Sequence, residues 1–277
     1  MVTSVNTNVN ALAAIQALSD ISSQLTSTQG AIESGLKVGS AADNPAVFTI
    51  AQGLRANVNA LTAVSDSLNT GIATLQGQTA GATSISTTLN TLKTTVTQSA
   101  GQTGAALAAS QATITNALAN ITAFAKATTI NGVNLLDSTA ATPSKTADFL
   151  SNVSGTATSV TVATYSDTAS LGLSTLAATV DGTTTGTTSA ITALDAAIKQ
   201  IGATLTQLGS GTVQLQGLKS FTDQLSASNT TSLGSMVDAN LSQESAKLSS
   251  LQTKQSLAIQ SLSIANQGPG ALLQLFR

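Results

Sequence analysis

The sequence of 277 residues contains no cysteine, no histidine and no tryptophan. Without cysteine the chain can form no disulfide framework and carry out no thiolate chemistry. Without histidine it lacks the commonest general base and the commonest metal ligand. The sequence also has no phosphate-binding glycine loop and no nucleophile-elbow motif. We therefore expect a protein that is not an enzyme and that holds no cofactor or metal.

Charged and aromatic residues are also scarce. Charged residues make up 8% of the chain, against about 25% in an ordinary globular protein, and aromatic residues make up 2%. The net charge is −2 and no basic run occurs, which argues against a nucleic-acid partner. No uncharged apolar run of about 18 residues predicts a membrane span. A core of 42% hydrophobic residues without large rings is most easily built from thin helices with aliphatic seams.

The clearest pattern in the sequence is the helical spacing of its apolar residues. Apolar residues recur every three or four positions in residues 1–36, 47–99, 107–124, 191–225 and 241–265. In residues 1–36 the opposite face carries Asn, Ser, Gln and Thr with almost no charge. Such a face either covers a second protein surface or belongs to a plain amphipathic helix rich in Ser and Thr. Residues 1–20 do not resemble a signal peptide, so an extracellular location would require export without a cleaved signal.

The stretch Ser34–Arg55 should separate the first two helices. Gly35 and Pro45 predict that one helix ends near Leu36 and that a long one begins near Pro45. Ser40 or Asp43 can supply the N-cap oxygen of the second helix.

In the long helix that follows, Gly71, Gly77 and Gly81 either weaken the helix or let a neighbour approach closely. The segment Gly101–Gly104 predicts a turn. A later pair, Asn131–Gly132, predicts a tight β-turn.

Beyond that turn the helical period is lost. Residues 138–189 are rich in Thr, Ser and Gly with short β-like pieces, and we expect a small exposed insert there. Helical spacing resumes at residue 191, and the sequence leaves open whether Gly209 and Gly211 form a turn or lie within a helix.

The last helix carries the clearest repeat. Its heptad seam consists of Leu241, Glu244, Leu248, Leu251, Gln255, Ala258, Leu262 and Ala265. The helix should end near Gln267, because Gly268–Pro269–Gly270 disfavours its continuation. The tail, residues 272–277, is apolar and packs either on its own chain or in the core of an assembly.

Together these elements predict a mainly α fold, an elongated helical bundle and coiled coil with a small β-rich central insert. We expect three parts. The first, a terminal coiled-coil domain, is made of residues 1–40 and 240–277. The second, a helical shell domain with a β-hairpin, is made of residues 41–137 and 190–239. The third is a variable surface insert over residues 138–189.

Five short motifs, in order along the chain, resemble bacterial flagellin. They are Val5–Asn6–Thr7–Asn8 with Ala11–Leu12, the Ser34–Arg55 turn, Asn69–Thr70–Gly71–Ile72–Ala73 with Leu75–Gln76, Gln243–Glu244–Ser245–Ala246–Lys247–Leu248, and Ala265–Asn266–Gln267 with Pro269, Leu272, Leu273, Leu275 and Arg277. The chain departs from the family at Ala31 and Ala42, where flagellins often have basic residues.

The resemblance implies a structural subunit of the flagellar filament that serves swimming motility outside the cell. It further implies self-assembly, alone or mixed with other flagellins, together with the flagellar export apparatus, an export chaperone and a filament cap protein. The terminal helices should be loosely ordered in the monomer and pair on assembly. We expect the assembly interface to include Val5, Val9, Leu12, Ile15, Leu18, Ile21, Leu25, Leu241, Leu248, Leu251, Leu262, Leu272, Leu275, Phe276 and Arg277.

Two other interpretations remain open from the sequence. A hook–filament junction protein has flagellin-like ends, usually with a larger middle segment. A secreted helical adhesin would share the helical composition but would have no reason to carry the terminal motifs.

Overall fold

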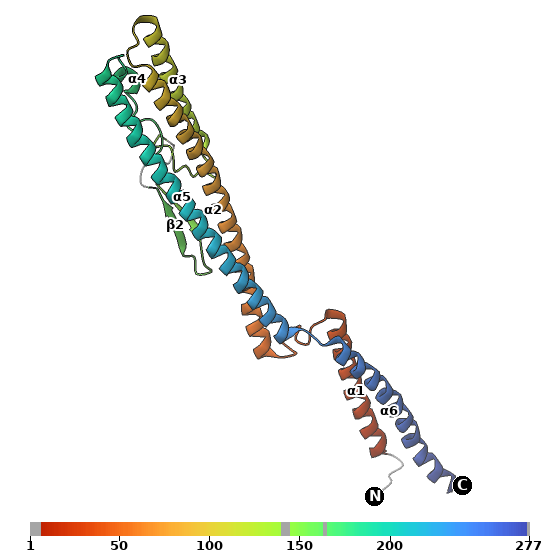
Figure 1. The fold of residues 1–277 in the computed structure, drawn as a ribbon. Helices are drawn as coiled ribbons and strands as arrows, with labels where there is room; N and C mark the ends of the chain where they lie inside the picture. Colours follow the sequence, from red (N-terminus) through yellow and green to blue (C-terminus); the bar gives the residue numbers. More distant parts are fainter. Residues whose placement is uncertain (1–6, 140–144, 163–164, 276–277) are drawn as a thin grey trace. The chain divides into compact units, whose positions relative to one another are not determined.

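A computed structural model describes residues 7–139, 145–162 and 165–275, with side chains described up to residue 267 (Figure 1). This part of the chain is mainly helical and has one small sheet, which confirms the predicted fold class. Its elements in chain order are α1 (Val9–Ser34), α2 (Pro45–Gln98), α3 (Gly104–Ala127), β1 (Thr146–Leu150), β2 (Ala157–Thr161), α4 (Leu176–Thr179), α5 (Thr184–Val237) and α6 (Leu241–Leu275).

The chain divides into two compact units. One comprises residues 1–58 and 228–277, and the other comprises residues 59–227. Helices α2 and α5 contribute residues to both units. The three-part division expected from the sequence stays a prediction.

The core of the unit 59–227 is aliphatic and is built from α2, α3, α5 and the segment between α3 and α5. Its largest fully buried side chains are Leu68, Leu75, Ile85, Leu89, Leu92, Ile114, Ile121, Leu135, Leu136, Leu173, Leu194 and Ile201. Most follow the helical spacing read from the sequence. Phe124 differs, because it is 38% exposed although its spacing placed it on the inner face of its helix.

The two strands form an antiparallel hairpin that packs on α2 and α5. Thr146 pairs with Thr161 and Leu150 pairs with Ala157. The Phe149 ring lies so close to Gly71 that a Cβ there would be 2.8 Å from it. Gly71 therefore lets a neighbour approach closely, which is the second role that the sequence allowed for the α2 glycines.

Helix α5 is continuous through Gly209 and Gly211, which settles the question that the sequence left open. A Cβ on Gly211 would lie 2.6 Å from the side chain of Val160 on β2. Gly211 therefore provides space for the hairpin and does not mark a turn.

The predicted tight turn at Asn131–Gly132 is present. Asn131 has φ 51° and Gly132 has φ 78°, which are the values of a type I′ turn. Ile130 and Val133 exchange two backbone hydrogen bonds of 3.0 and 2.9 Å across it. A buried glutamine of α2, Gln78, bonds this loop to α2. Its Nε2 donates to the carbonyls of Thr128 (2.6 Å) and Val133 (3.2 Å).

Threonine side chains on α2 form a ladder, defined here as Thr79, Thr83, Thr87, Thr91 and Thr95. Each hydroxyl donates to the backbone carbonyl four residues earlier, at distances between 2.7 and 3.2 Å. The hydroxyls are therefore satisfied within their own helix.

In the other unit, the predicted turn after the first helix is confirmed. Helix α1 ends at Ser34, and Gly35 takes the left-handed conformation at φ 71°. The amide of Lys37 donates to the carbonyl of Val237, and the amide of Ala239 donates to the carbonyl of Gly35, both at 2.8 Å. These bonds join the turn to the segment between α5 and α6.

The N-cap of α2 is Asn44, and the assignment to Ser40 or Asp43 was wrong. The Oδ1 of Asn44 accepts the amide of Val47 at 3.1 Å. Because Pro45 occupies the first helical position, the cap must be the residue directly before it. Asp43 instead accepts the amides of Gly39 (3.1 Å) and Ser40 (2.8 Å) and so shapes the preceding turn.

The predicted end of the last helix near Gln267 was also wrong. Helix α6 continues through Pro269 to Leu275. A proline has no N–H to donate, so the carbonyl four residues earlier, that of Ala265, is left without its helical partner. The Nδ2 of Asn8 donates to this carbonyl at 2.7 Å, so the carbonyl is not left without a donor.

Candidate functional site

Helices α1 and α6 lie side by side and bury a shared seam (Figure 1). The seam side of α1 carries Leu18, Ile21 and Leu25, all partly buried, together with buried Ala11 and Thr28. From α6 the less exposed residues are Glu244, Leu248, Leu251, Gln255, Ala258, Leu262 and Ala265. Seven of the eight predicted heptad positions therefore face inward. Leu241 does not, because it is 50% exposed.

Asn8 ties the start of α1 to the far part of α6. Its Oδ1 accepts the amide of Ala11 at 3.1 Å and so caps α1, while its Nδ2 donates to the carbonyl of Ala265. One side chain thus satisfies a helix N-terminus and a carbonyl that Pro269 leaves free. This arrangement gives a physical role to the last residue of the Val5–Asn8 motif.

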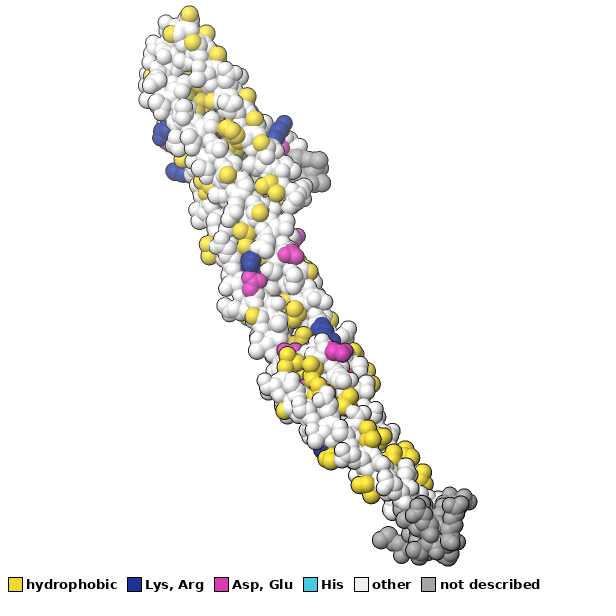
Figure 2. All heavy atoms as spheres, turned by 90° about the vertical axis from the view of Figure 1, so that its right-hand side faces the viewer, with side chains coloured by type: hydrophobic (Ala, Val, Ile, Leu, Met, Phe, Trp, Pro, Cys, Tyr) yellow, Lys and Arg dark blue, Asp and Glu magenta, His cyan; other side chains and the backbone are white. Residues whose placement is uncertain are grey.

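The pair of helices leaves apolar side chains exposed on its outer side. Val9, Leu12 and Ile15 of α1 are exposed by 69%, 58% and 51%. Hydrophobic side chains are visible on this part of the surface (Figure 2). The seam therefore buries only part of the apolar surface of these helices.

Three more large apolar residues, Leu257, Ile259 and Ile264 of α6, are also exposed and were missed from the sequence. They lie off the heptad seam. Leu257 and Ile264 are seven residues apart and so lie on one face of the helix, a second apolar repeat that could have revealed them. We call the exposed set Val9, Leu12, Ile15, Leu257, Ile259 and Ile264 the outer face.

A groove of about 420 Å³ runs between α1 and α6. It is lined by Ile15, Leu18, Ser19, Ser22, Ser23, Gln255 and Ile259. Its lining mixes aliphatic side chains with uncharged polar ones and contains no titratable group. Such a groove suits an aliphatic side chain of another helix better than a charged small molecule.

The predicted interface residues thus fall into three groups. Leu18, Ile21, Leu25, Leu248, Leu251 and Leu262 face the seam, whereas Val9, Leu12, Ile15 and Leu241 are exposed. Val5, Phe276 and Arg277 lie outside the described residues, and for Leu272 and Leu275 only the helical backbone is described.

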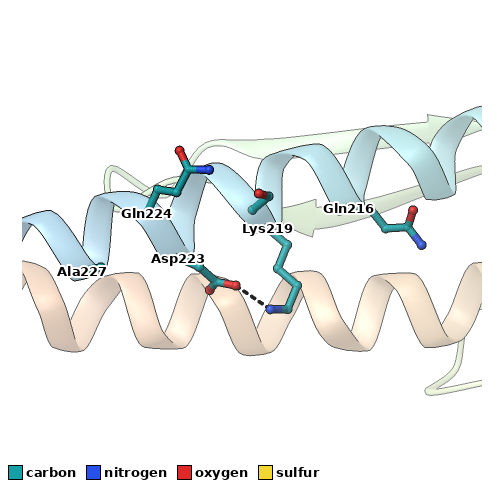
Figure 3. A pocket seen from close by; sticks show the side chains of 6 residues that line it. Gln216, Lys219, Asp223, Gln224 and Ala227 are labelled. Atoms are coloured by element: carbon teal, nitrogen blue, oxygen red, sulfur yellow. Dashed lines mark hydrogen bonds and ion pairs between the residues drawn. The ribbon is translucent and has the colours of Figure 1, made fainter.

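A second concavity, of about 410 Å³, lies on α5 (Figure 3). Its lining includes an ion pair in which Lys219 Nζ lies 2.6 Å from Asp223 Oδ2. The Oδ1 of Asp223 also accepts the hydroxyl of Ser65 on α2 at 2.9 Å. The hydrogen bond from Lys219, followed by that from Ser65, lowers the pKa of Asp223. Because these groups satisfy one another, the network joins two helices and offers no reactive group.

The described residues hold no cluster of three or more Asp or Glu side chains that could bind a metal. In the same part of the chain, no helix is both long and apolar enough to cross a membrane.

The fold and the outer face define a class of protein. They describe a helix-rich structural protein that keeps aliphatic surface on its two terminal helices, where other chains can cover it.

Comparisons with known proteins identify the family. Residues 5–141 match the bacterial flagellin N-terminal helical region, and residues 191–276 match the bacterial flagellin C-terminal helical region. Flagellin FljM of Caulobacter vibrioides is 36% identical over 287 residues, covering 99% of this chain and 98% of that protein. Flagellin FljK of the same organism is 34% identical over 291 residues, with the same coverage. A flagellin of Brucella melitensis is 30% identical over 285 residues, covering 99% of both chains.

The chain belongs to the bacterial flagellin family, which confirms the resemblance seen in its motifs. It is a structural subunit that polymerises into the extracellular flagellar filament and serves motility. The family is one of structural proteins. The full-length matches favour flagellin over the junction-protein and adhesin alternatives.

Proposed function

We propose that the outer face of the α1–α6 pair is the surface through which copies of this subunit meet in the filament. The observation that supports this proposal is that six large apolar side chains stay between 51% and 71% exposed after the pair has buried its own seam. Apolar surface that a monomer leaves uncovered often marks a protein–protein contact.

The seam and the outer face then have separate roles. The seam residues hold α1 against α6 within one chain, and the outer face contacts α1–α6 pairs of other copies. Burying aliphatic side chains contributes about 25 cal/mol per Å² of apolar surface removed from water. Because the outer face is nearly uncharged, its contacts should change little with salt concentration.

Family membership supports a proposal for partners beyond the polymer. We propose that the chain leaves the cell through the flagellar export apparatus without a cleaved signal peptide. In this proposal an export chaperone covers the apolar C-terminal part before export, and a cap protein guides addition at the filament tip. Copies of related flagellins can enter the same filament. The N-terminal sequence of filament protein tests the first point.

Elongation of short filament seeds by the purified chain tests the proposed surface. We expect Leu12→Gln combined with Ile259→Gln to abolish elongation observed by negative-stain electron microscopy, because both changes place amides in an apolar contact. Ser27→Gln, at an exposed polar position on α1, is the matched control and should elongate seeds as the unmodified chain does.

A second variant, which lacks residues 1–36 and 241–277, should also fail to elongate seeds. Circular dichroism and thermal unfolding of the Leu12/Ile259 variant must match the unmodified chain, so that loss of assembly is not loss of folding. Normal elongation by that double variant would overturn the assignment of the outer face.

A further inference from the structure

The chain contains one Asn–Gly pair, Asn131–Gly132, at the tip of the tight turn that follows α3. A backbone nitrogen that follows an asparagine can attack the side-chain amide of that asparagine. Glycine in the second position leaves this nitrogen unshielded, because it has no Cβ. The reactivity of such a pair then depends on what the fold does with the two reacting groups.

In this turn the side-chain amide of Asn131 and the backbone amide of Gly132 are both accessible to solvent. Asn131 and Gly132 are exposed, and a Cβ on Gly132 would meet nothing within 4 Å. Within the described part of the chain, neither the side chain of Asn131 nor the amide of Gly132 makes a hydrogen bond. The Ile130–Val133 backbone pair holds only the base of the turn.

A second asparagine three residues later provides an internal contrast. Asn134 is buried, and its Nδ2 donates to the carbonyl of Ala125 at 2.8 Å. Its Oδ1 accepts the amides of Leu136 (2.8 Å) and Asp137 (3.0 Å). The following amide, that of Leu135, is also engaged, because it donates to Oε1 of Gln78 at 3.3 Å.

The pair Asp181–Gly182 has the same reactive pattern, but hydrogen bonds and close packing hold its two reacting groups in place. The Oδ1 of Asp181 accepts the hydroxyl (2.6 Å) and the amide (2.9 Å) of Thr183, and these bonds lower the pKa of this carboxyl. A Cβ on Gly182 would lie 2.2 Å from the carbonyl oxygen of Gln102, so the backbone here is tightly packed. An ionised, hydrogen-bonded carboxylate on a packed turn is a poor target for attack.

We propose that Asn131 is a site of spontaneous deamidation in the folded subunit. The amide nitrogen of Gly132 loses its proton and attacks Cγ of Asn131, forming a new C–N bond. The bond from Cγ to Nδ2 breaks and ammonia leaves, which produces a cyclic imide. Water then adds to either carbonyl of the imide and opens it to aspartate or to isoaspartate. No electrons are transferred, and water is the only other reactant.

Isoaspartate at this position would disturb the packing of the loop on α2. It adds one methylene to the backbone, so Ile130 and Val133 can no longer stay in register. The side chain of Ile130 fills the space above Gly77, and Gln78 holds the carbonyl of Val133. Ageing molecules should therefore lose the attachment of this loop to α2.

The test is incubation of the folded, full-length chain in warm, mildly alkaline buffer made with heavy-oxygen water. Trypsin then releases the peptide 127–145, which contains both Asn131 and Asn134. Fragmentation mass spectrometry should find heavy oxygen and isoaspartate at position 131, several-fold above position 134. The peptide with Asp181 should contain no isoaspartate.

Two controls decide the outcome. Asn131→Gly keeps a residue that favours positive φ and has no side-chain amide, so its peptide should stay unlabelled. In urea the Asp181–Gly182 pair should begin to react, because its hydrogen bonds are lost. Equal labelling of positions 131 and 134 in the folded chain would overturn the proposal. So would label at position 131 that forms only in urea.

Discussion

At the scale of single residues, several glycines of the long helices leave space into which neighbouring side chains pack. A Cβ on Gly77 would lie 2.1 Å from Ile130, and one on Gly81 would lie 2.0 Å from Thr128. Each glycine costs helix stability, by roughly 1 kcal/mol relative to alanine. The close packing of the loop at residues 128–136 offsets this cost.

Substitution of these glycines distinguishes the two effects. Gly81→Ala should lower the free energy of unfolding by about 1–3 kcal/mol, because Thr128 must move to admit the methyl group. Gly202→Ala, at an exposed position of α5 with open space around it, should raise it by about 0.5–1 kcal/mol. Urea unfolding of both variants checks the prediction, and equal stabilisation by both would contradict the packing argument.

At the scale of elements, one asparagine links the start of α1 with α6, a helix that contains a proline. Asn8 caps α1 and also donates to the carbonyl of Ala265, which Pro269 cannot reach with an N–H. The proline in α6 is thus tolerated because a partner helix supplies the missing donor.

This link predicts an energetic coupling between Asn8 and Pro269. Asn8→Ala should destabilise the α1–α6 pair by about 1–2 kcal/mol, since both a cap and a hydrogen bond are lost. In a Pro269→Ala background the backbone N–H returns, so the same Asn8→Ala change should cost less. Amide exchange of residues 9–34 in a double-mutant cycle measures the difference. Strictly additive effects would show that the two positions are independent.

The helices were predictable from sequence because aliphatic spacing and the Gly–Pro signals near residues 35 and 45 are local. The continuation of α6 was not predictable, because the donor that rescues it lies 257 residues away. The N-cap at Asn44 could have been found by placing the cap directly before Pro45. Choosing between the two roles of Gly71, Gly77 and Gly81 needed knowledge of which distant segments pack there.

The candidate site could also be predicted only in part, because the sequence does not show which apolar residues another segment covers. Heptad spacing identified the seam residues of α6, but seam and outer face are both apolar and differ only in what covers them. Leu257, Ile259 and Ile264 were overlooked because they fall off the seam. Periodicity finds the face that one chain buries, and surface exposure is needed to find the apolar residues that the chain leaves uncovered.

At the scale of the whole molecule, the two units differ in how much they bury. The described part of α1 buries only Ala11 and Thr28, and that of α6 only Leu251. The unit of residues 59–227 instead holds a continuous core across three long helices. Local opening should therefore cost less free energy in the α1–α6 pair.

Hydrogen exchange of the monomer should show this difference. We expect amides of residues 9–34 and 241–265 to exchange faster than those of residues 68–96, because few buried contacts oppose their opening. Protection of the terminal helices should rise after polymerisation. Equal protection of both regions in the monomer would mean that the pair is already fully stable.

Stability should also fall in acid. Burial raises the pKa of Asp167, but its several hydrogen bonds with Ser138 and Ser170 together outweigh burial, so the pKa is lowered overall. The pKa values of Asp43, Asp181 and Asp223 are lowered as well. Groups with lowered folded-state pKa values stabilise the fold above their ordinary value of 3.8 and lose this contribution as pH falls through the folded value.

The free energy of unfolding should therefore decline below about pH 4. Asp167→Asn should be less stable at neutral pH and should show a shallower decline in acid. Asp148→Asn, at an exposed position on the hairpin, controls for the loss of one charge. Urea unfolding at a series of pH values measures both, and identical profiles for the two variants would contradict the role of Asp167.

The threonine ladder of α2 affects the free-energy cost of packing another surface against this helix. Its hydroxyl protons already bind the helix backbone, so the exposed members present methyl groups and oxygens that require no new donor. Removing water from such a surface leaves no hydroxyl proton without an acceptor, so the penalty for an unmatched donor does not arise. A neighbour that packs on these threonines therefore needs a complementary shape but no acceptor for their hydroxyl protons.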